Sequence, residues 1–327
     1  MGVSSLGKDH TWEINLAARA AWMSYVGELT QSEIAKRLGV SSARVHRLIQ
    51  LAKQHGIIRI SIEGRPAECM HLEAEIAAAF GLKSCTISPY LASRKDNADL
   101  SSLSVGQAAG QVLAQHLVMT QTGSVTVDPF GQVLVDTFTS MPQFPRPDLQ
   151  VWAATGCLSQ SYQASNSEVL SLLELRTGAK VSMIPAPYAP GTEAEWQNFS
   201  ALPAITDALQ KAAKSDIFVG QIKGADQMEE TVGASHISDI AASGAVCRWL
   251  GTYFDAQGCK VELPATARTI NVPLDRVGAD EKAATPRAFA LAAGERSSAT
   301  TQAALCTGLV TDLILDEALA NALASIF

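Results

Sequence analysis

Aromatic residues make up only 6% of the 327-residue chain, and no apolar run in it is long enough to span a bilayer. The six cysteines never occur as a C-x-x-C pair, which argues against a zinc site and against a disulfide framework. We expect free, mostly buried thiols instead. The N-terminus lacks the basic, apolar and small-residue sections of a secretory signal. We therefore expect a protein of the cytoplasm that has no membrane partner.

Two nucleotide-binding motifs are absent as well. The chain has no G-x-G-x-x-G and no G-x-x-x-x-G-K-[ST] sequence, which argues against a dinucleotide enzyme and against a P-loop NTPase.

His236 lies near Ser235 and Asp239, but a catalytic triad is defined by geometry and not by sequence order. We predict no cofactor and no metal ion.

The charge of the chain is divided unevenly along its length. The net charge is −7, which by itself argues against a nucleic-acid partner. Residues 1–65, however, hold nine Lys or Arg and five Asp or Glu, whereas the remainder of the chain holds 16 and 27. A basic head on an acidic body is the distribution expected when only the head contacts phosphate. The length of the chain also favours two or more domains.

Residues 29–56 predict two short helices joined by a tight turn. Thr30 and Glu33 have the spacing of a capping box, in which each side chain satisfies a backbone N–H group. Gly39 ends the first helix, and Ser41 caps the second. This layout is typical of a helix-turn-helix, whose second helix enters the major groove of DNA.

We expect the DNA-contacting residues at the start of the first helix and on the outer face of the second. They are Thr30, Gln31, Ser41, Ser42, Arg44, His46 and Arg47. Whichever arginine faces a guanine edge would specify the DNA sequence, whereas His46 is expected to contact phosphate. The expected partner is a double-stranded DNA operator.

A third helix and a wing complete the predicted head. The helix is expected over 14–25, with either Trp22 or Met23 on its buried side. The run 57–62 alternates between apolar and polar residues as a strand does, which suggests a β-wing after the recognition helix.

From Pro66 onward the pattern changes to helices that alternate with short apolar strands. It predicts a Rossmann-like α/β domain with a mostly parallel sheet over 66–327, after a winged helix-turn-helix domain over 12–63. The expected helices are 67–80 and 100–119, and the expected strands are 84–88, 124–127, 149–154, 180–184, 217–219, 269–272, 288–291 and 309–315. Gly106 and Gly110 indicate close packing of the second helix.

Polar residues beside glycines follow four of these strands. In an open α/β sheet, ligands bind beyond the carboxyl ends of the strands, where helix N-termini attract anions. Each glycine could also be ordinary turn punctuation. Four such turns on one sheet edge nevertheless favour a small-molecule pocket. The turns are Phe130-Gly131-Gln132, Thr155-Gly156, Gly220-Gln221 and the stretch from Ala293 to Ser298.

Arg248 is unusual because it lies among apolar and aromatic residues in the segment 244–258. It could clamp a phosphate or a carboxylate with two parallel hydrogen bonds. It could equally be a surface arginine whose stem packs on Trp249. The sequence leaves both interpretations open.

The chain resembles the SorC family of sugar-responsive bacterial transcriptional regulators from about Ile14 to its C-terminus. The resemblance rests on TQSEIAKRLGVSSARVHRLIQLAKQHGIIRISI at the head, and on GAVCRWLGTYFDAQG and FALAAGERSSATTQAALCTGLVTDLILDEALANAL in the body. It implies a winged helix-turn-helix followed by an effector domain similar to glucosamine-phosphate and ribose-phosphate isomerases. It also implies a carbohydrate effector, usually phosphorylated, a homodimer or homotetramer on a palindromic operator, and no enzymatic activity.

We expect the effector-binding residues at the four turns, which the resemblance implies, and in the segment 244–258. They are Gly131, Gln132, Thr155, Gly156, Gly220, Gln221, Arg248, Asp255, Gly294, Glu295, Arg296 and Ser297. The chain departs from the family here, because Val133 stands where the family usually has threonine and Ser297 where it usually has lysine. Cys247-Arg248 replaces a Gly-Asp pair.

These departures remove phosphate-binding groups, while Arg248 and Arg296 could restore positive charge from other directions. Either a phosphate is held differently or the effector is an unphosphorylated sugar or polyol, and we favour a phosphorylated ligand. A sugar-phosphate isomerase or deaminase with a DNA-binding head is the alternative function. Asp128 and Asp255 are its only candidate bases, and neither has a convincing partner in the sequence. We therefore predict a regulator of a carbohydrate-catabolism operon.

Overall fold

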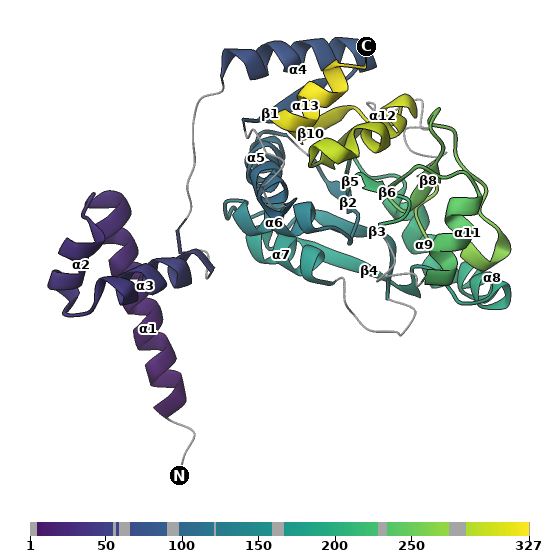
Figure 1. Cartoon of the computed structure of the whole chain (residues 1–327). Coiled ribbons are helices and arrows are strands. Elements are labelled where there is room, and N and C mark those ends of the chain that lie inside the picture. The colour runs from purple at the N-terminus through teal and green to yellow at the C-terminus, as the bar shows by residue number, and fades with distance from the viewer. Residues whose placement is uncertain are drawn as a thin grey trace. The chain divides into compact units, whose positions relative to one another are not determined.

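The structure is a computed structural model of the chain, and its contacts divide the chain into two compact units, Met1–Gly64 and Arg65–Phe327 (Figure 1). It describes residues 5–54, 57–58, 66–89, 98–120, 122–158, 167–227, 234–274 and 286–326. In this part of the chain, none of the helices has the length and the apolar composition that crossing a membrane requires.

The first unit is helical and has one small core. Its elements are α1 (Ser5–Ala21), a π-helical turn η1 (Trp22–Val26), α2 (Gln31–Leu38) and α3 (Ser42–Gln54). The first helix begins well before its predicted start at residue 14. Of the two alternatives for its buried side, Met23 packs on the core, whereas the side chain of Trp22 is 67% exposed.

Local side-chain chemistry sets the ends of α2 and α3 as predicted. The Thr30 hydroxyl accepts from the Glu33 N–H, and a Glu33 carboxylate oxygen accepts from the Thr30 N–H at 2.8 Å. Gly39 ends α2 in the left-handed conformation with φ of 64°. The Ser41 hydroxyl accepts from the Arg44 N–H at 3.2 Å and so caps α3. Most of the predicted wing, residues 59–62, lies outside the described residues.

The second unit alternates helices with strands, as predicted. Its first half contains α4 (Ala67–Phe80), β1 (Ser84–Ser88), α5 (Ala98–Met119), β2 (Ser124–Val127), α6 (Gln132–Ser140), β3 (Gln150–Leu158), α7 (Ser167–Thr177), β4 (Lys180–Pro187), α8 (Glu193–Ala201) and α9 (Pro203–Ala212). Its second half contains β5 (Ile217–Gln221), β6 (Lys223–Gly224), α11 (Ala234–Ala242), β7 (Cys247–Trp249), β8 (Thr252–Phe254), η2 (Ala265–Ala267), β9 (Arg287–Ala292), η4 (Glu295–Ser297), α12 (Ser298–Cys306), β10 (Asp312–Asp316) and α13 (Glu317–Ala324).

A seven-stranded parallel sheet forms the centre of this unit, in the order β1-β10-β9-β5-β2-β3-β4. Its central strands β10, β9, β5 and β2 are buried on both faces, whereas the edge strand β4 is partly exposed, and successive side chains of each strand point to opposite faces. In β9, for example, Phe289 and Leu291 join the core that contains α5, α6 and α7, whereas Ala288 and Ala290 join the core that contains α4, α12 and α13. The predicted α/β class with a mostly parallel sheet is confirmed.

Close packing of α5 against α6 is also confirmed. A Cβ atom on Gly106 would lie 2.4 Å from the Asp136 Cβ atom, and one on Gly110 would lie 2.7 Å from the Thr137 carbonyl oxygen. The absence of side chains at these two positions lets the helix backbones approach.

A second sheet, β6-β7-β8, is antiparallel and was not predicted. Its hairpin joins Trp249 to Thr252 through a two-residue turn, Leu250-Gly251, with φ of 49° and 82°. Positive φ at both turn residues matches the twist of the strands. Leucine is rarely found in this conformation, so the turn carries no recognisable sequence signal.

The predicted strand over 269–272 is wrong. The segment makes one isolated bridge, between Asn271 and Thr155, and is otherwise irregular. Its backbone forms hydrogen bonds with Ala154 and Gly156, where the register between β3 and β4 shifts. Both edges of β3 are already paired, with β2 and with β4, so the segment cannot add a further strand to the sheet. The other predicted strands exist, with β3, β4 and β5 extending beyond their predicted carboxyl ends.

Candidate functional site

The outer face of α3 carries three of the seven predicted DNA contacts, together with Gln50. Ser42, His46, Arg47 and Gln50 are exposed at helical spacing, so they share one face of the helix. Thr30, Gln31 and Ser41 are also exposed, at the starts of α2 and α3, although the side chains of Thr30 and Ser41 serve as helix caps.

Arg44 lies at the flank of this face and is only partly exposed. Its guanidinium carbon is 5.9 Å from the ring centroid of Trp12 on α1. Arg44 and Arg47 line a shallow hollow together with Glu13 and Gln50. Arg47 is therefore the arginine that projects most freely from the recognition helix.

The predicted effector turns lie within or after four neighbouring strands of the large sheet, in the order β9-β5-β2-β3. Gly131-Gln132 and the stretch from Ala293 follow β2 and β9, and Gln221 ends β5, whereas Thr155 and Gly156 lie within β3. The chain adds β3 and β4 on one side of β2 and then returns to add β5 on the other. The boundary between β2 and β5 is thus a topological switch point, where open α/β sheets bind their ligands.

Arg248 and Asp128 form an ion pair at this edge, with both side chains 0% exposed. The guanidinium donates to both carboxylate oxygens, at 2.7 and 3.1 Å, and Arg248 Nε donates to the Tyr188 hydroxyl at 2.9 Å. The rings of Phe130 and Tyr188 lie 5.3 and 4.9 Å from its guanidinium carbon. Burial alone would lower the pKa of Arg248, but the Asp128 carboxylate and the two tyrosines around it raise it above its usual value.

This environment corrects both interpretations of Arg248. It is not a surface arginine packed on Trp249, because it is fully buried. In this structure it clamps a carboxylate of its own chain, so a ligand could reach it only by displacing Asp128. Both carboxylate oxygens of Asp128, a candidate base of the alternative enzyme, accept hydrogen bonds from Arg248.

The side chain of Gln221 lies against the N-terminus of α6 at the switch point. Its side-chain carbonyl oxygen accepts from the Val133 N–H at 3.2 Å, one of the free donors of the first helical turn. Gly131 has φ of 138°, and a Cβ atom there would lie 2.1 Å from that oxygen. Gln132 is exposed and donates to Asp136 at 3.0 Å.

The turn after β9 is tied down by Asp316 at the end of β10. Asp316 accepts from the Gly294 N–H at 2.5 Å and, with its other oxygen, from the Leu319 N–H at 3.0 Å. Glu295 and Arg296 lie on η4, and Arg296 is exposed. Ser297 ends η4 and is the N-cap residue before α12, and its hydroxyl donates to the Ala293 carbonyl oxygen.

Thr155, Gly156 and Gly220 lie inside β3 and β5 rather than after them, which corrects their predicted place. Thr155 is 0% exposed, and a Cβ atom on Gly156 would lie 2.6 Å from two carbonyl oxygens near the end of β4. The Gly220 carbonyl oxygen accepts from the Trp249 indole. Gly156 is needed because β4 approaches β3 closely, and Gly220 because the second sheet approaches β5 closely.

The carboxylate of Asp255 also accepts hydrogen bonds from its own chain. One of its carboxylate oxygens accepts from the N–H groups of Gln257 and Cys259, both at 2.9 Å, and so closes the turn after β8.

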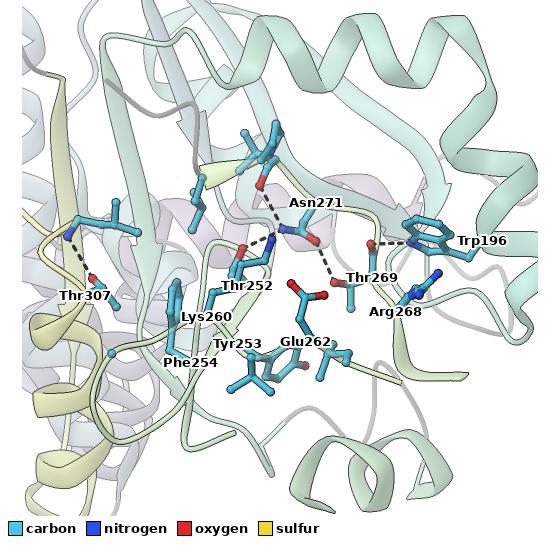
Figure 2. A pocket seen from close by; sticks show the side chains of 17 residues that line it. Trp196, Thr252, Tyr253, Phe254, Lys260, Glu262, Arg268, Thr269, Asn271 and Thr307 are labelled. Carbon is cyan, nitrogen blue, oxygen red and sulfur yellow. Dashed lines mark hydrogen bonds between the residues drawn. The ribbon is translucent and has the colours of Figure 1, made fainter. Parts of the chain in front are cut away.

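A cleft of about 660 Å³ lies in the second unit, beside β3, and includes none of the predicted site residues. Its walls come from α8, from β8 and the segment after it, and from the irregular segment 268–274 (Figure 2). Its polar side chains include Thr252, Lys260, Glu262, Arg268, Thr269 and Asn271. No sequence signal pointed to this cleft, because most of its lining lies in a stretch, 252–274, that carries no recognisable motif.

The remaining candidates do not form a further site. All six cysteines are free. Among the described residues, no three His, Cys, Asp or Glu side chains converge as metal ligands. His236 is buried and lies 3.4 Å from the Pro190 carbonyl oxygen, which is a structural contact.

Comparison with known families identifies both units. A family described as "Putative sugar-binding domain" matches residues 64–325. The chain belongs to this family. A second family, described as "Sigma-70, region 4", matches residues 19–55, which include α2 and α3.

Curated relatives of this sugar-binding-domain protein are regulators. The erythritol catabolism regulatory protein EryD of Brucella abortus is 28% identical over 314 residues, which cover 94% of this chain and 96% of EryD. The transcriptional regulator LsrR of Klebsiella pneumoniae is 27% identical over 318 residues, covering 95% and 93%. The predicted class, a SorC-type transcriptional regulator rather than an enzyme, is confirmed.

A solved structure also has the same fold. The full-length sorbitol operon regulator SorC from Klebsiella pneumoniae aligns with a TM-score of 0.66 and 16% identity, over 95% of this chain and 98% of that chain.

Proposed function

We propose that this regulator binds operator DNA through α3 and that a neutral sugar or polyol controls this binding from the carboxyl edge of the large sheet. The effector lies at the β2/β5 switch point, in contact with Gly131, Gln132, Gln221 and Ser297. The protein acts in the cytoplasm as a homodimer or homotetramer on a palindromic operator, whose two half-sites match the symmetry of the oligomer.

One observation carries the choice of a neutral effector: three groups at this edge that would attract an anion already have acceptors from the protein. Arg248 is paired with Asp128, the Val133 N–H with Gln221, and the Gly294 N–H with Asp316. A phosphate would have to displace a buried carboxylate or an amide to gain these donors. The contacts at this edge thus favour a neutral ligand over the phosphorylated one that the sequence favours. Arg296, which is exposed, is the remaining cation of the predicted set.

The name of one relative supports the same chemistry. EryD is named for the catabolism of erythritol, which is an uncharged polyol. The effector would act by binding one arrangement of the oligomer more tightly than another, because a ligand shifts a conformational equilibrium only by its difference in affinity for the two states.

The test measures DNA binding and ligand binding on the full-length chain. A fluorescent duplex selected from a random pool reports DNA affinity by anisotropy. Erythritol, xylitol and sorbitol are added in turn, each beside its phosphate ester. We expect a neutral polyol to change DNA affinity at least fivefold, and its phosphate ester to have a weaker effect.

Gln221→Ala should raise the polyol concentration needed for half of this change, while DNA affinity without polyol stays the same. Gln115→Ala, on the exposed face of α5, is the matched control and should behave as the unaltered protein. A response to phosphate esters alone would overturn the neutral effector. An unchanged response in Gln221→Ala would remove the switch point as its site.

A further inference from the structure

We infer that the cleft between α8 and the segment after β8 is a second binding site, with lining residues different from those of the four turns, for a small neutral polyhydroxylated molecule. Its volume of about 660 Å³ is in the range of small-molecule pockets. The twelve residues predicted for effector binding are absent from its walls, so the site does not depend on the proposed function.

The polar wall of the cleft is ordered by Asn271. Its amide nitrogen donates to the Thr252 hydroxyl oxygen at 2.9 Å and to the Val272 carbonyl oxygen at 3.1 Å, and its amide oxygen accepts from the Thr269 hydroxyl at 2.9 Å. Thr252 thus accepts one hydrogen bond and keeps its own O–H group for a further partner. Figure 2 shows this network at the centre of the cleft wall.

Lys260 and Glu262 supply opposite charges around the same hollow (Figure 2). In the described part of the chain, neither side chain makes a hydrogen bond or an ion pair. Hydroxyl groups both donate and accept, so one polyol can donate to Glu262 while it accepts from Lys260. Charge-assisted bonds of this kind are stronger than neutral ones.

Arg268 does not disturb this balance of charge. Its guanidinium lies 4.9 Å from the centroid of the Trp196 ring and 3.6 Å from the Glu193 carboxylate. The Trp196 indole donates to the Thr269 carbonyl oxygen at 3.0 Å. The free charges facing the cleft are therefore one positive and one negative, which favours an uncharged ligand over an anion.

The test is calorimetric titration of the full-length protein with erythritol, xylitol, sorbitol, ribose and glucose, and with inorganic phosphate as the charged probe. Tryptophan fluorescence is followed in parallel. We expect at least one neutral probe to bind with a change in fluorescence that Trp196→Phe abolishes. Glu262→Ala and Lys260→Met should each weaken this binding at least tenfold.

Glu174→Ala and Lys180→Met, which remove the same charges from exposed positions on α7 and β4, are the matched controls and should leave the binding unchanged. Unfolding midpoints of all variants confirm that each is folded. If no neutral probe binds in a Glu262-dependent way, the inference is wrong. Phosphate binding that depends on Lys260 would overturn the neutral ligand class.

Two variants separate this inference from the proposed function. Gln221→Ala should keep binding in the cleft and require more polyol for the effect on DNA, whereas Glu262→Ala should lose cleft binding and leave the effect on DNA as it is in the unaltered protein. Loss of both properties in either variant would mean a single site and would overturn the second one. Failure of the DNA response alone would count against the proposed function only.

Discussion

Arg248 and Asp128 make the most costly polar interaction in the sugar-binding unit, because both side chains are withdrawn from water. Replacing Arg248 by Met leaves the Asp128 carboxylate buried without a counterion. We expect this change to lower the free energy of unfolding by about 3–5 kcal/mol. The measurement is the urea midpoint of the full-length chain, followed by circular dichroism.

Two controls test whether the uncompensated charge is the cause. Combining Arg248→Met with Asp128→Leu removes both charges and should recover most of the loss. Lys211→Met breaks an ion pair with Asp207 in which both side chains are more than half exposed, and should cost less than about 1 kcal/mol. If the double variant were as unstable as Arg248→Met, loss of packing rather than of charge would explain the effect.

The six cysteines divide into two classes at the residue scale. Cys259 and Cys306 are exposed, and the other four are buried. Burial raises the pKa of Cys157 to about 11 and that of Cys247 to about 12, which keeps both thiols protonated at neutral pH. We expect two thiols to react rapidly with Ellman's reagent at pH 8, and four to react only after unfolding in urea.

The same pKa values predict the response to alkali. A thiol whose pKa is higher in the folded than in the unfolded chain stabilises the fold fully below the unfolded pKa, near 9. That contribution is lost as the pH rises from about 9 through the folded values of about 11 and 12. Cys247→Ala should therefore lose less stability than the unaltered protein between pH 8 and pH 10. An identical loss in both would contradict this assignment.

At the scale of elements, α3 presents its two arginines differently. Arg47 projects from the exposed face, whereas Arg44 packs near Trp12. We expect Arg47→Ala to weaken DNA binding by about 1–3 kcal/mol if it reads a base, and Arg44→Ala to weaken it less. Anisotropy at several salt concentrations gives both affinities and salt slopes.

The double variant Arg44→Ala/Arg47→Ala should bind most weakly and show the flattest salt dependence, because each lost phosphate contact lowers the slope by about 1. Lys180→Ala, in the other unit, removes one positive charge and should change neither quantity. Unchanged DNA affinity in the double variant would exclude α3 from the DNA interface.

The contact between α5 and α6 reverses the usual effect of a Gly to Ala change in a helix. In an exposed helix, this change stabilises by about 1 kcal/mol. At Gly106 the added methyl group would lie 2.4 Å from the Asp136 Cβ atom, so the helices must separate. We expect Gly106→Ala to destabilise the unit by about 1–3 kcal/mol in urea unfolding.

Gln107→Ala, one residue further along the same helix and exposed, is the control for this change. It should be neutral or slightly stabilising, because alanine has the higher helix propensity. A stabilising Gly106→Ala would mean that the two helices are not in close contact.

At the scale of the whole molecule, the two compact units should respond separately to their ligands. A polyol at 100 times its dissociation constant stabilises the unit that binds it by about 2.7 kcal/mol. In scanning calorimetry of the full-length chain, we expect such a polyol to raise the transition of the sugar-binding unit and DNA to raise that of the helix-turn-helix unit. A polyol that raised only the transition of the helix-turn-helix unit would contradict this division.

The parts of the molecule that were predictable are those in which neighbouring residues determine structure. Thr30, Glu33 and Gly39 satisfy or redirect backbone groups within a few positions, so the ends of α2 follow from local chemistry. The strands of the large sheet are apolar on both faces, which makes them visible as short runs. The β7-β8 hairpin was missed because its turn uses Leu250 at a positive φ.

The sequence by itself determined the helix-turn-helix, the alternation of helices and strands, and the order of turns along the chain, because capping, periodicity and glycine conformation act over short distances. Only the tertiary structure decided that Arg248 is buried against Asp128, that Thr155 and Gly156 lie within a strand, and that Lys260 and Glu262 face one cleft. The ion pair joins residues from distant segments, the extent of β3 is set by pairing with its neighbours, and the cleft is set by the course of the chain after β8. No local pattern in the sequence records any of these three features.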